Sequence, residues 1–197
     1  MSRRPLLGLL GQYRLVYPAE ASVVDRITQL VSQHTDCFER TCRPGHITGS
    51  AWVLSADRRQ CLLVHHRKLG RWLQPGGHAD GDPDTLQVAQ REACEESGLT
   101  RLEPLDRHGL PLDIDIHQIP ARYDDRGGLI DDAHEHHDIR YLFAAAGEEP
   151  LAVSAESHDV RWVRAEELPS LSSEESVLRL LRKSAKYMPA GAATGGS

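Results

Sequence analysis

Three glutamates near the middle of the chain have the spacing of a set of metal ligands. Glu92, Glu95 and Glu96 lie in residues 82–96, where the apolar pattern predicts a helix, and their spacing puts three carboxylates on one helical face. Like charges this close repel each other. A hard divalent cation such as Mg²⁺ or Mn²⁺, which prefers oxygen ligands and often also holds phosphates, would remove the repulsion. An ordinary solvated acidic face is the competing interpretation.

Neighbouring residues could complete such a site. Arg91 precedes Glu92 and is placed to pair with a carboxylate and hold its orientation. Gly76 and Gly77 come before the predicted helix, and glycines let the backbone approach a ligand closely. Their carbonyl oxygens are therefore additional candidate ligands.

The predicted helix begins at Asp82 and Pro83 and stops at Gly98. Asp82 can cap free backbone N–H groups, and Pro83 needs no donor at the first helical position. Asp84 adds negative charge at the positive end of the helix.

The same segment resembles the sequence box of the Nudix hydrolase family. That box reads G, five residues, E, seven residues, and then R-E-U-x-E-E-x-G-U, in which U is a bulky apolar residue. The resemblance extends over residues 45–168, because a short strand at 72–74 leads into the box and residues 160–168 are similar to the family's closing strand and helix. Seven fixed positions match over 23 residues, with Ala93 as a small first apolar residue: Gly77, Arg91, Glu92, Glu95, Glu96, Gly98 and Leu99.

The resemblance implies a metal-dependent hydrolase. Its substrate would be a nucleoside diphosphate linked to another moiety, cleaved at the pyrophosphate bond by attack of water on phosphorus. The resemblance also implies that Glu92, Glu95 and Glu96 ligate Mg²⁺ or Mn²⁺. The carbonyl of Gly76 or Gly77 would complete the ligand set.

Two catalytic roles beside the metal ligands follow from the same resemblance. It implies that Arg91 orients the carboxylate of Glu92. A further glutamate often lies outside the family's box, and Glu156, six residues before Trp162, is the best match for an additional ligand or general base.

One position departs from the box. Its first glutamate falls on Pro83, which has no carboxylate, and Asp80, Asp82 or Asp84 could supply one instead. The departure also leaves open a second function, a nucleotide-binding module with an impaired box that does not hydrolyse its ligand.

Polar and cationic residues around the expected cleft are candidate substrate contacts, because cations there suit an anionic substrate. Nucleotide sugars, ADP-ribose, dinucleoside polyphosphates and modified nucleoside triphosphates all carry the reacting group, so the substrate stays open. The candidates are His65, Arg71, His78, Asp80 and His137.

A histidine run at residues 134–137 is a further cluster, which His46, His78 and His117 could join in space. Solvated histidines beside a phosphate cleft are the favoured interpretation, because no HExxH or CxxC spacing supports a separate zinc site. Whether these histidines bind a metal stays open.

Hydrophobic periodicity predicts the elements that position these residues. A first helix is expected at residues 19–34, and a last helix is expected to start at Ser172 through a capping box with Glu175. Residues 75–77 are expected to interrupt regular structure, and residues 121–137 to form a long polar loop. Strands are expected at residues 47–54, 60–66, 72–74, 112–119, 139–146 and 160–163.

In the strand at 112–119, alternation predicts one apolar face and one solvent-facing polar face that carries Asp113, Asp115 and His117. The order of elements predicts an α/β (α+β) fold, a Nudix-like α/β/α sandwich around a mixed β-sheet, with an extra N-terminal helix. We expect a helical extension at residues 1–44, a hydrolase domain at 45–188 and a flexible tail at 189–197.

Composition excludes several classes of protein. The 197 residues carry a net charge of −6 without a basic stripe, which argues against a nucleic-acid binder. No apolar run approaches the roughly 18 residues of a membrane span, and no cleavage site follows the N-terminal apolar run. Four cysteines without a CxxC pair are expected to be free thiols in a reducing, cytoplasmic compartment. Whether the protein forms a homodimer stays open.

Overall fold

Strand β1 (Gly45–Leu54) is buried along its whole length and forms the centre of the sheet in the computed structural model, which describes residues 2–189. The order of the larger sheet is β10-β2-β1-β9-β5, with β3 attached to β2, β4 to β1 and β6 to β9. β1 and β9 are parallel, and the other pairs are antiparallel. The other strands are β2 (Gln60–His66), β3 (Arg71–Leu73), β4 (Gly76–His78), β5 (Leu102–Pro104), β6 (Asp113–Ile119), β7 (Arg122–Tyr123), β8 (Leu129–Asp131), β9 (His134–Ala145) and β10 (Ser157–Arg164).

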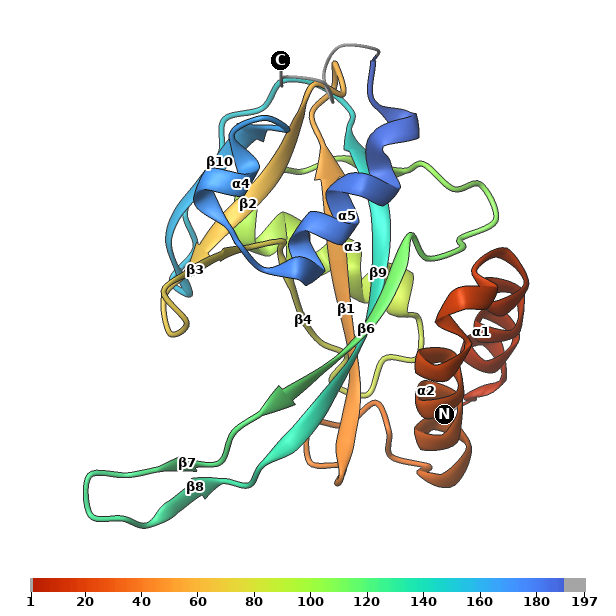
Figure 1. Cartoon of the computed structure of the whole chain (residues 1–197). Coiled ribbons are helices and arrows are strands. Elements are labelled where there is room, and N and C mark those ends of the chain that lie inside the picture. The colour runs from red at the N-terminus through yellow and green to blue at the C-terminus, as the bar shows by residue number, and fades with distance from the viewer. Residues whose placement is uncertain (1, 190–197) are drawn as a thin grey trace.

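Helices cover both faces of this sheet (Figure 1). Side chains alternate between the faces of a strand, so Ile47, Ala51 and Val53 of β1 pack in the core beneath α1, α2 and α3. Trp52 and Leu54 point the other way, into the core beneath α4 and α5. The predicted α/β/α sandwich is confirmed. The helices are α1 (Arg4–Val16), α2 (Ala21–Gln33), α3 (Thr85–Ser97), α4 (Leu168–Leu171) and α5 (Glu175–Ser184), with 3₁₀ turns η1 (Pro18–Glu20) and η2 (Ala185–Tyr187).

The N-terminal region contains two helices, not the single one predicted at residues 19–34. α2 matches that prediction, and α1 precedes it. Leu6, Leu10 and Tyr13 of α1 lie four and three residues apart and are buried in the core. Two glycines in this helix lower its intrinsic helix propensity, so packing rather than propensity stabilises it.

The prediction of a long loop at residues 121–137 is wrong. β6 and β9 extend beyond the body of the molecule as an antiparallel ribbon, and β7 and β8 form its tip (Figure 1). Tyr123, Leu129 and Ile130 at this tip are exposed. Because the two-stranded tip has solvent on both faces, β7 and β8 lack the alternation that marks a half-buried strand.

The polar face of β6 is buried at Asp113 and half-buried at Asp115 and His117, so the prediction of a solvent-facing side is wrong at Asp113. The Asp113 side chain is fully buried and forms ion pairs with Arg140 of β9 and with Arg179 and Lys183 of α5. α5 covers this face because its cations neutralise the carboxylate.

The last helix begins later than its predicted capping box. α5 starts at Glu175 with no side-chain cap, and Ser172 Oγ accepts a hydrogen bond from the N–H of Glu174 at 3.4 Å in the turn before it. The four cysteines are free thiols, as predicted. Within residues 2–189 no helix has the length and apolar character needed to cross a bilayer. The predicted tail lies, from residue 190 onward, outside the described residues.

Candidate active site

Helix α3 carries the three glutamates. Asp84 caps its N-terminus by accepting a hydrogen bond from the N–H of Gln87 at 3.1 Å, and the helix ends at Gly98 with φ +76°. This left-handed conformation suits glycine, so the predicted stop is confirmed. The predicted start at Asp82 and Pro83 is wrong, because Asp82 accepts from the N–H of Asp84 at 2.9 Å in the turn before the helix.

The glycine pair before α3 belongs to a strand, although residues 75–77 were expected to interrupt regular structure. β4 pairs antiparallel with β1 and lies against α3. A Cβ on Gly77 would overlap the carboxylate of Glu92, so this carboxylate occupies the space that a side chain at position 77 would take. The N–H of Gly76 donates to Glu96 Oε2 at 3.0 Å. The glycine backbone and the glutamates therefore meet at one place.

Arg91 holds one of these carboxylates in place. Its Nη2 donates to Glu92 Oε1 at 2.8 Å and to the carbonyl oxygen of His78 at 3.1 Å. One guanidinium thus fixes the orientation of Glu92 and ties α3 to the end of β4.

The three glutamates differ in burial. Glu96 is 7% exposed, Glu92 is half-buried and Glu95 is exposed. Burial raises the pKa of Glu96 to about 7, the N–H of Gly76 opposes the shift, and the charges of Glu92, Glu156 and Glu95 add to it. Burial also raises the pKa of Glu92, although Arg91 opposes it. The ionised forms are therefore disfavoured until another positive charge is present.

The donor set fits a hard divalent cation. Carboxylate and carbonyl oxygens are the ligands that Mg²⁺ and Mn²⁺ prefer, and a cation would offset the burial of Glu92 and Glu96. The carboxylate oxygens of the three glutamates do not all lie within 4.8 Å of one another. Glu92 is turned toward Arg91, and Glu96 toward the N–H of Gly76.

Glu156 lies in the neighbourhood that the sequence suggested. It is exposed and directly precedes β10, and its carbonyl oxygen accepts from the N–H of Arg67 at 2.9 Å. Its charge contributes to the raised pKa of Glu96. Its carboxylate therefore belongs to the surroundings of the box glutamates.

Two of the candidate substrate contacts border these carboxylates. His78 ends β4, and its carbonyl oxygen is held by Arg91. Asp80 pairs with Arg40 at 2.6 Å, and its charge contributes to the raised pKa of Glu92.

Two other candidates lie on the β2–β3 hairpin. The ring of His65 stacks on Trp72 with centroids 5.0 Å apart, and the guanidinium of Arg161 lies 4.3 Å from the centre of the Trp72 ring. Arg71 is exposed and pairs with Glu174 at 2.8 Å. This hairpin presents aromatic and cationic groups together.

His137 is separate from both groups. It is buried, and its Nε2 lies 2.9 Å from Glu135 Oε2, which pairs in turn with Arg26 of α2. Side chains alternate along β9, so His137 and His136 point to opposite faces of the sheet.

Comparison with known proteins decides the family. The profile of the NUDIX domain matches residues 46–183, which is more than half of the chain. The chain belongs to the Nudix family.

Solved structures of Nudix proteins have the same fold. An Ap4A hydrolase from C. elegans superposes with a TM-score of 0.54 at 18% identity, over 72% of this chain and 96% of that one. A Nudix-family hydrolase from Clostridium perfringens gives 0.55 at 21% identity, over 72% and 97% of the two chains. The dihydroneopterin triphosphate pyrophosphohydrolase of E. coli gives 0.51 at 16% identity, over 72% and 94%. At these identities the likeness shows the fold alone.

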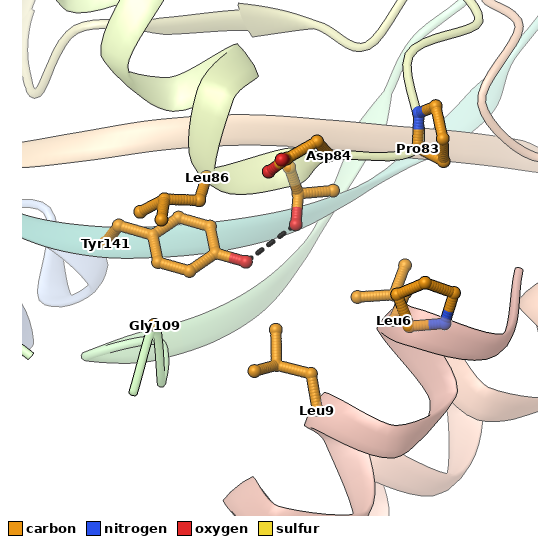
Figure 2. Close-up of a pocket in the computed structure, with 9 residues that line it drawn as sticks. Leu6, Leu9, Pro83, Asp84, Leu86, Gly109 and Tyr141 are labelled. Carbon is orange, nitrogen blue, oxygen red and sulfur yellow. Dashed lines mark hydrogen bonds between the residues drawn. The ribbon is translucent and has the colours of Figure 1, made fainter. Parts of the chain in front are cut away.

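A pocket of about 280 Å³ lies between α1 and the start of α3, outside the Nudix glutamate cluster (Figure 2). Pro83 lines it together with Leu6 and Leu9 of α1. Thr85 Oγ1 and Tyr141 Oη share a hydrogen bond of 2.6 Å in its wall. Pro83 therefore borders the space between α1 and the start of α3.

Proposed function

We propose that this Nudix protein is a metal-dependent hydrolase that cleaves the pyrophosphate bond of a nucleoside diphosphate linked to another moiety. The observation that carries the proposal is the meeting of Glu92 and Glu96 with the Gly76–Gly77 backbone, with Arg91 holding Glu92 at 2.8 Å. Phosphoryl chemistry depends mainly on positioning and charge neutralisation, and this arrangement supports both.

In this proposal Glu92, Glu95, Glu96 and the carbonyl of Gly77 hold Mg²⁺ or Mn²⁺. When bound, the cation neutralises phosphate charge and makes water a stronger nucleophile toward phosphorus. The raised pKa of Glu96 supports the assignment, because a cation is what its buried carboxylate lacks.

Two residues have catalytic roles beside the ligands. Arg91 keeps the Glu92 carboxylate oriented through its two hydrogen bonds. Glu156 is exposed to solvent and acts electrostatically on Glu96, so it is the candidate for receiving the proton of the attacking water or for an additional ligand.

Substrate binding is assigned to two nearby surfaces. His78 and Asp80 border the glutamates, and His65 and Arg71 lie on the hairpin that also carries Trp72. Stacked aromatic and cationic groups suit a nucleotide that carries phosphate charge. His137, bonded to Glu135, is not part of this assignment.

The box position that falls on Pro83 favours one alternative, a binding module that holds a nucleotide without cleaving it. Three aspartates surround this position. Asp84 caps the helix and Asp80 pairs with Arg40, whereas the charge of Asp82 acts on Arg91. We propose that Asp82 supplies the missing negative charge beside Arg91.

The division of the chain into domains and its cellular compartment are part of the same proposal. We assign the hydrolase unit to residues 45–188, a span that includes the family match, and the helical extension to the residues before it. Three of the four free cysteines are buried, which suits a reducing, cytoplasmic compartment.

The deciding experiment is hydrolysis of a panel of nucleoside diphosphate derivatives in ¹⁸O-labelled water, with Mg²⁺ or Mn²⁺ present. Attack on phosphorus predicts ¹⁸O in a phosphate product and release of a nucleoside monophosphate or phosphate. The combined variant Glu95→Gln and Glu96→Gln should lose this activity, and Glu103→Gln, an exposed glutamate on β5, should keep it. Saturable binding of a panel member without cleavage would support the binding module instead.

A further inference from the structure

Four histidines that are far apart in the chain gather on one face of the sheet. His46 of β1 lies opposite His136 of β9, and Thr48 of β1 lies opposite His78 of β4. Residues two apart on a strand share a face, so His46, His78, His134 and His136 all project to the same side. The ring centroids lie 4.7 Å apart for His46 and His136, 5.1 Å for His46 and His134, and 5.0 Å for His78 and His136.

Three of these imidazoles have the spacing of metal ligands. One ring nitrogen from each of His46, His134 and His136 lies within 4.8 Å of the other two. The Nε2 atoms of His134 and His136 are 3.3 Å apart. Two nitrogens bound to one tetrahedral Zn²⁺ at 2.0–2.1 Å are separated by about 3.3 Å, so this pair already has the required distance.

The tautomer of His134 leaves a lone pair on the nitrogen that faces the cluster. Its Nδ1 lies 2.7 Å from the carbonyl oxygen of Asp132, which can only accept a hydrogen bond. Nδ1 therefore carries the proton, and Nε2 is the unprotonated nitrogen. A backbone carbonyl that fixes a histidine in this way is common behind metal-ligating imidazoles.

His46 is the histidine that packing alone explains least. It is 1% exposed, and neither ring nitrogen has a hydrogen-bond partner among the described residues. A buried polar group without a partner is destabilising, and a metal ion would satisfy one of the two ring nitrogens. Burial and the neighbouring imidazoles lower the pKa of His46 and that of His136.

The charges around the histidine cluster allow a metal cation to bind there. Arg43 also acts electrostatically on His46, but it is neutralised by an ion pair with Asp131 at 2.8 Å. His136 and His78 are half-buried, which leaves the cluster a solvent-facing side for entry of an ion.

We propose that His46, His134 and His136 bind one divalent transition-metal ion, with Zn²⁺ as the best match, at a site separate from the box carboxylates. Imidazole nitrogens favour Zn²⁺ and its neighbours in the first transition series, whereas the box oxygens favour Mg²⁺ or Mn²⁺. Three protein ligands leave a fourth tetrahedral position, and His78 lies beside the cluster where it can contact a ligand bound there. A packed histidine cluster with one His134–His136 hydrogen bond is the competing account.

The test is a competition titration of the chelator-treated full chain with Zn²⁺ against a chromophoric chelator, in excess Mg²⁺ to occupy the carboxylates. We expect one Zn²⁺ per chain, and a Co²⁺-substituted sample should show the intense visible absorption of a four-coordinate ion. His134→Gln with His136→Gln should weaken Zn²⁺ binding by about 100-fold or more, because even indirect support of a ligand contributes 10- to 100-fold.

Two controls keep the result specific. His108→Gln changes an exposed histidine and should leave the Zn²⁺ affinity unchanged. Glu95→Gln with Glu96→Gln should also leave the Zn²⁺ affinity unchanged. A failure of the zinc-site proposal can therefore be distinguished from a failure of the proposed hydrolase function. His136→Gln alone, at a half-buried position, replaces the double variant if that variant does not fold. Stoichiometric Zn²⁺ binding that survives the histidine changes, or no binding to the unmodified chain, would overturn the proposal.

Discussion

Two groups of buried carboxylates in this molecule have opposite surroundings. Asp113 and Asp138, on β6 and β9, face Arg140, which donates to Asp138 at 2.8 Å and to Asp113 at 3.2 Å. Among residues 2–189, Glu92 and Glu96 of α3 have one guanidinium beside them, that of Arg91, which donates to Glu92 and not to Glu96. The sheet carboxylates are matched by cations, whereas on α3 Glu92 has one cationic partner and Glu96 has none among the described residues.

The pKa shifts follow this difference. Burial alone would raise the pKa of Asp113, but Arg179, Arg140 and Lys183 outweigh it and hold the pKa below its ordinary value. Burial raises the pKa of Glu96 to about 7, and the opposing hydrogen bond from the N–H of Gly76 does not prevent it. The fold thus neutralises the sheet carboxylates by itself and leaves Glu96 of α3 without a matching charge, which is the difference expected between a structural network and the metal site that we propose.

The largest expected effect is on turnover. Glu92→Gln removes a charge while keeping the shape, so the rate on whichever substrate the panel identifies should fall by about 10² to 10⁴-fold. The free energy of unfolding should change by less than about 1 kcal/mol, because the Arg91–Glu92 pair is partly exposed and the lost charge was disfavoured by burial. Rate and denaturant unfolding are measured on the same preparation. A Glu92→Gln variant that keeps nearly the full rate would show that Glu92 is only a surface charge.

The sheet network should respond in the opposite way. Arg140→Leu leaves Asp113 and Asp138 buried without their shared partner, so urea unfolding should show a loss of about 3–5 kcal/mol. Arg182→Leu is the matched control, because the ion pair of Arg182 with Glu175 is exposed, and it should cost at most about 1 kcal/mol. Equal losses of unfolding free energy in the two variants would show that the buried sheet carboxylates do not depend on Arg140 more than an exposed pair depends on its arginine.

A smaller effect concerns pH. In chelator-treated protein the folded state binds the Glu96 proton up to about pH 7, whereas the unfolded chain releases it near 4.5. Between these values the folded state binds more protons, so the contribution of Glu96 to the free energy of unfolding falls as pH rises. The stability difference between the unmodified chain and Glu96→Gln should therefore decline from about pH 4.5 to about pH 7.

Saturating Mn²⁺ should abolish that decline, because a cation favours the ionised carboxylate. Thermal or urea unfolding at several pH values, with and without Mn²⁺, measures it. A difference that stays constant with pH in the absence of metal would show that burial does not penalise the Glu96 charge.

Elements with one buried face could be predicted from the sequence. The expected strand at residues 60–66 is β2, and the core of α3 follows from its apolar spacing. β7 and β8 could not be predicted, since a ribbon exposed on both faces has no apolar alternation. α1 was missed because its two glycines hide a helix that tertiary packing stabilises.

The candidate site could also be predicted only in part from the sequence. Helical periodicity was enough to predict that Glu92, Glu95 and Glu96 share one face of a helix, and the glycine pair before it was predicted as a candidate source of further ligands. The burial of Asp113 could not be predicted, because alternating polar residues on β6 resemble a solvent-facing side until Arg179 of α5 packs over them. Likewise, the contact of His46 with His136 depends on the register of two parallel strands, which the sequence does not state.

The central claim is that Glu92, Glu95 and Glu96 of α3 bind a divalent cation. Calorimetric titration with Mn²⁺ of the unmodified chain and of Glu95→Gln with Glu96→Gln tests it directly, with Glu103→Gln and the His134→Gln, His136→Gln double variant as controls. The account predicts Mn²⁺ binding that weakens by about tenfold or more in the glutamate double variant, and by much less in both controls. Unchanged Mn²⁺ affinity in the glutamate double variant would contradict it.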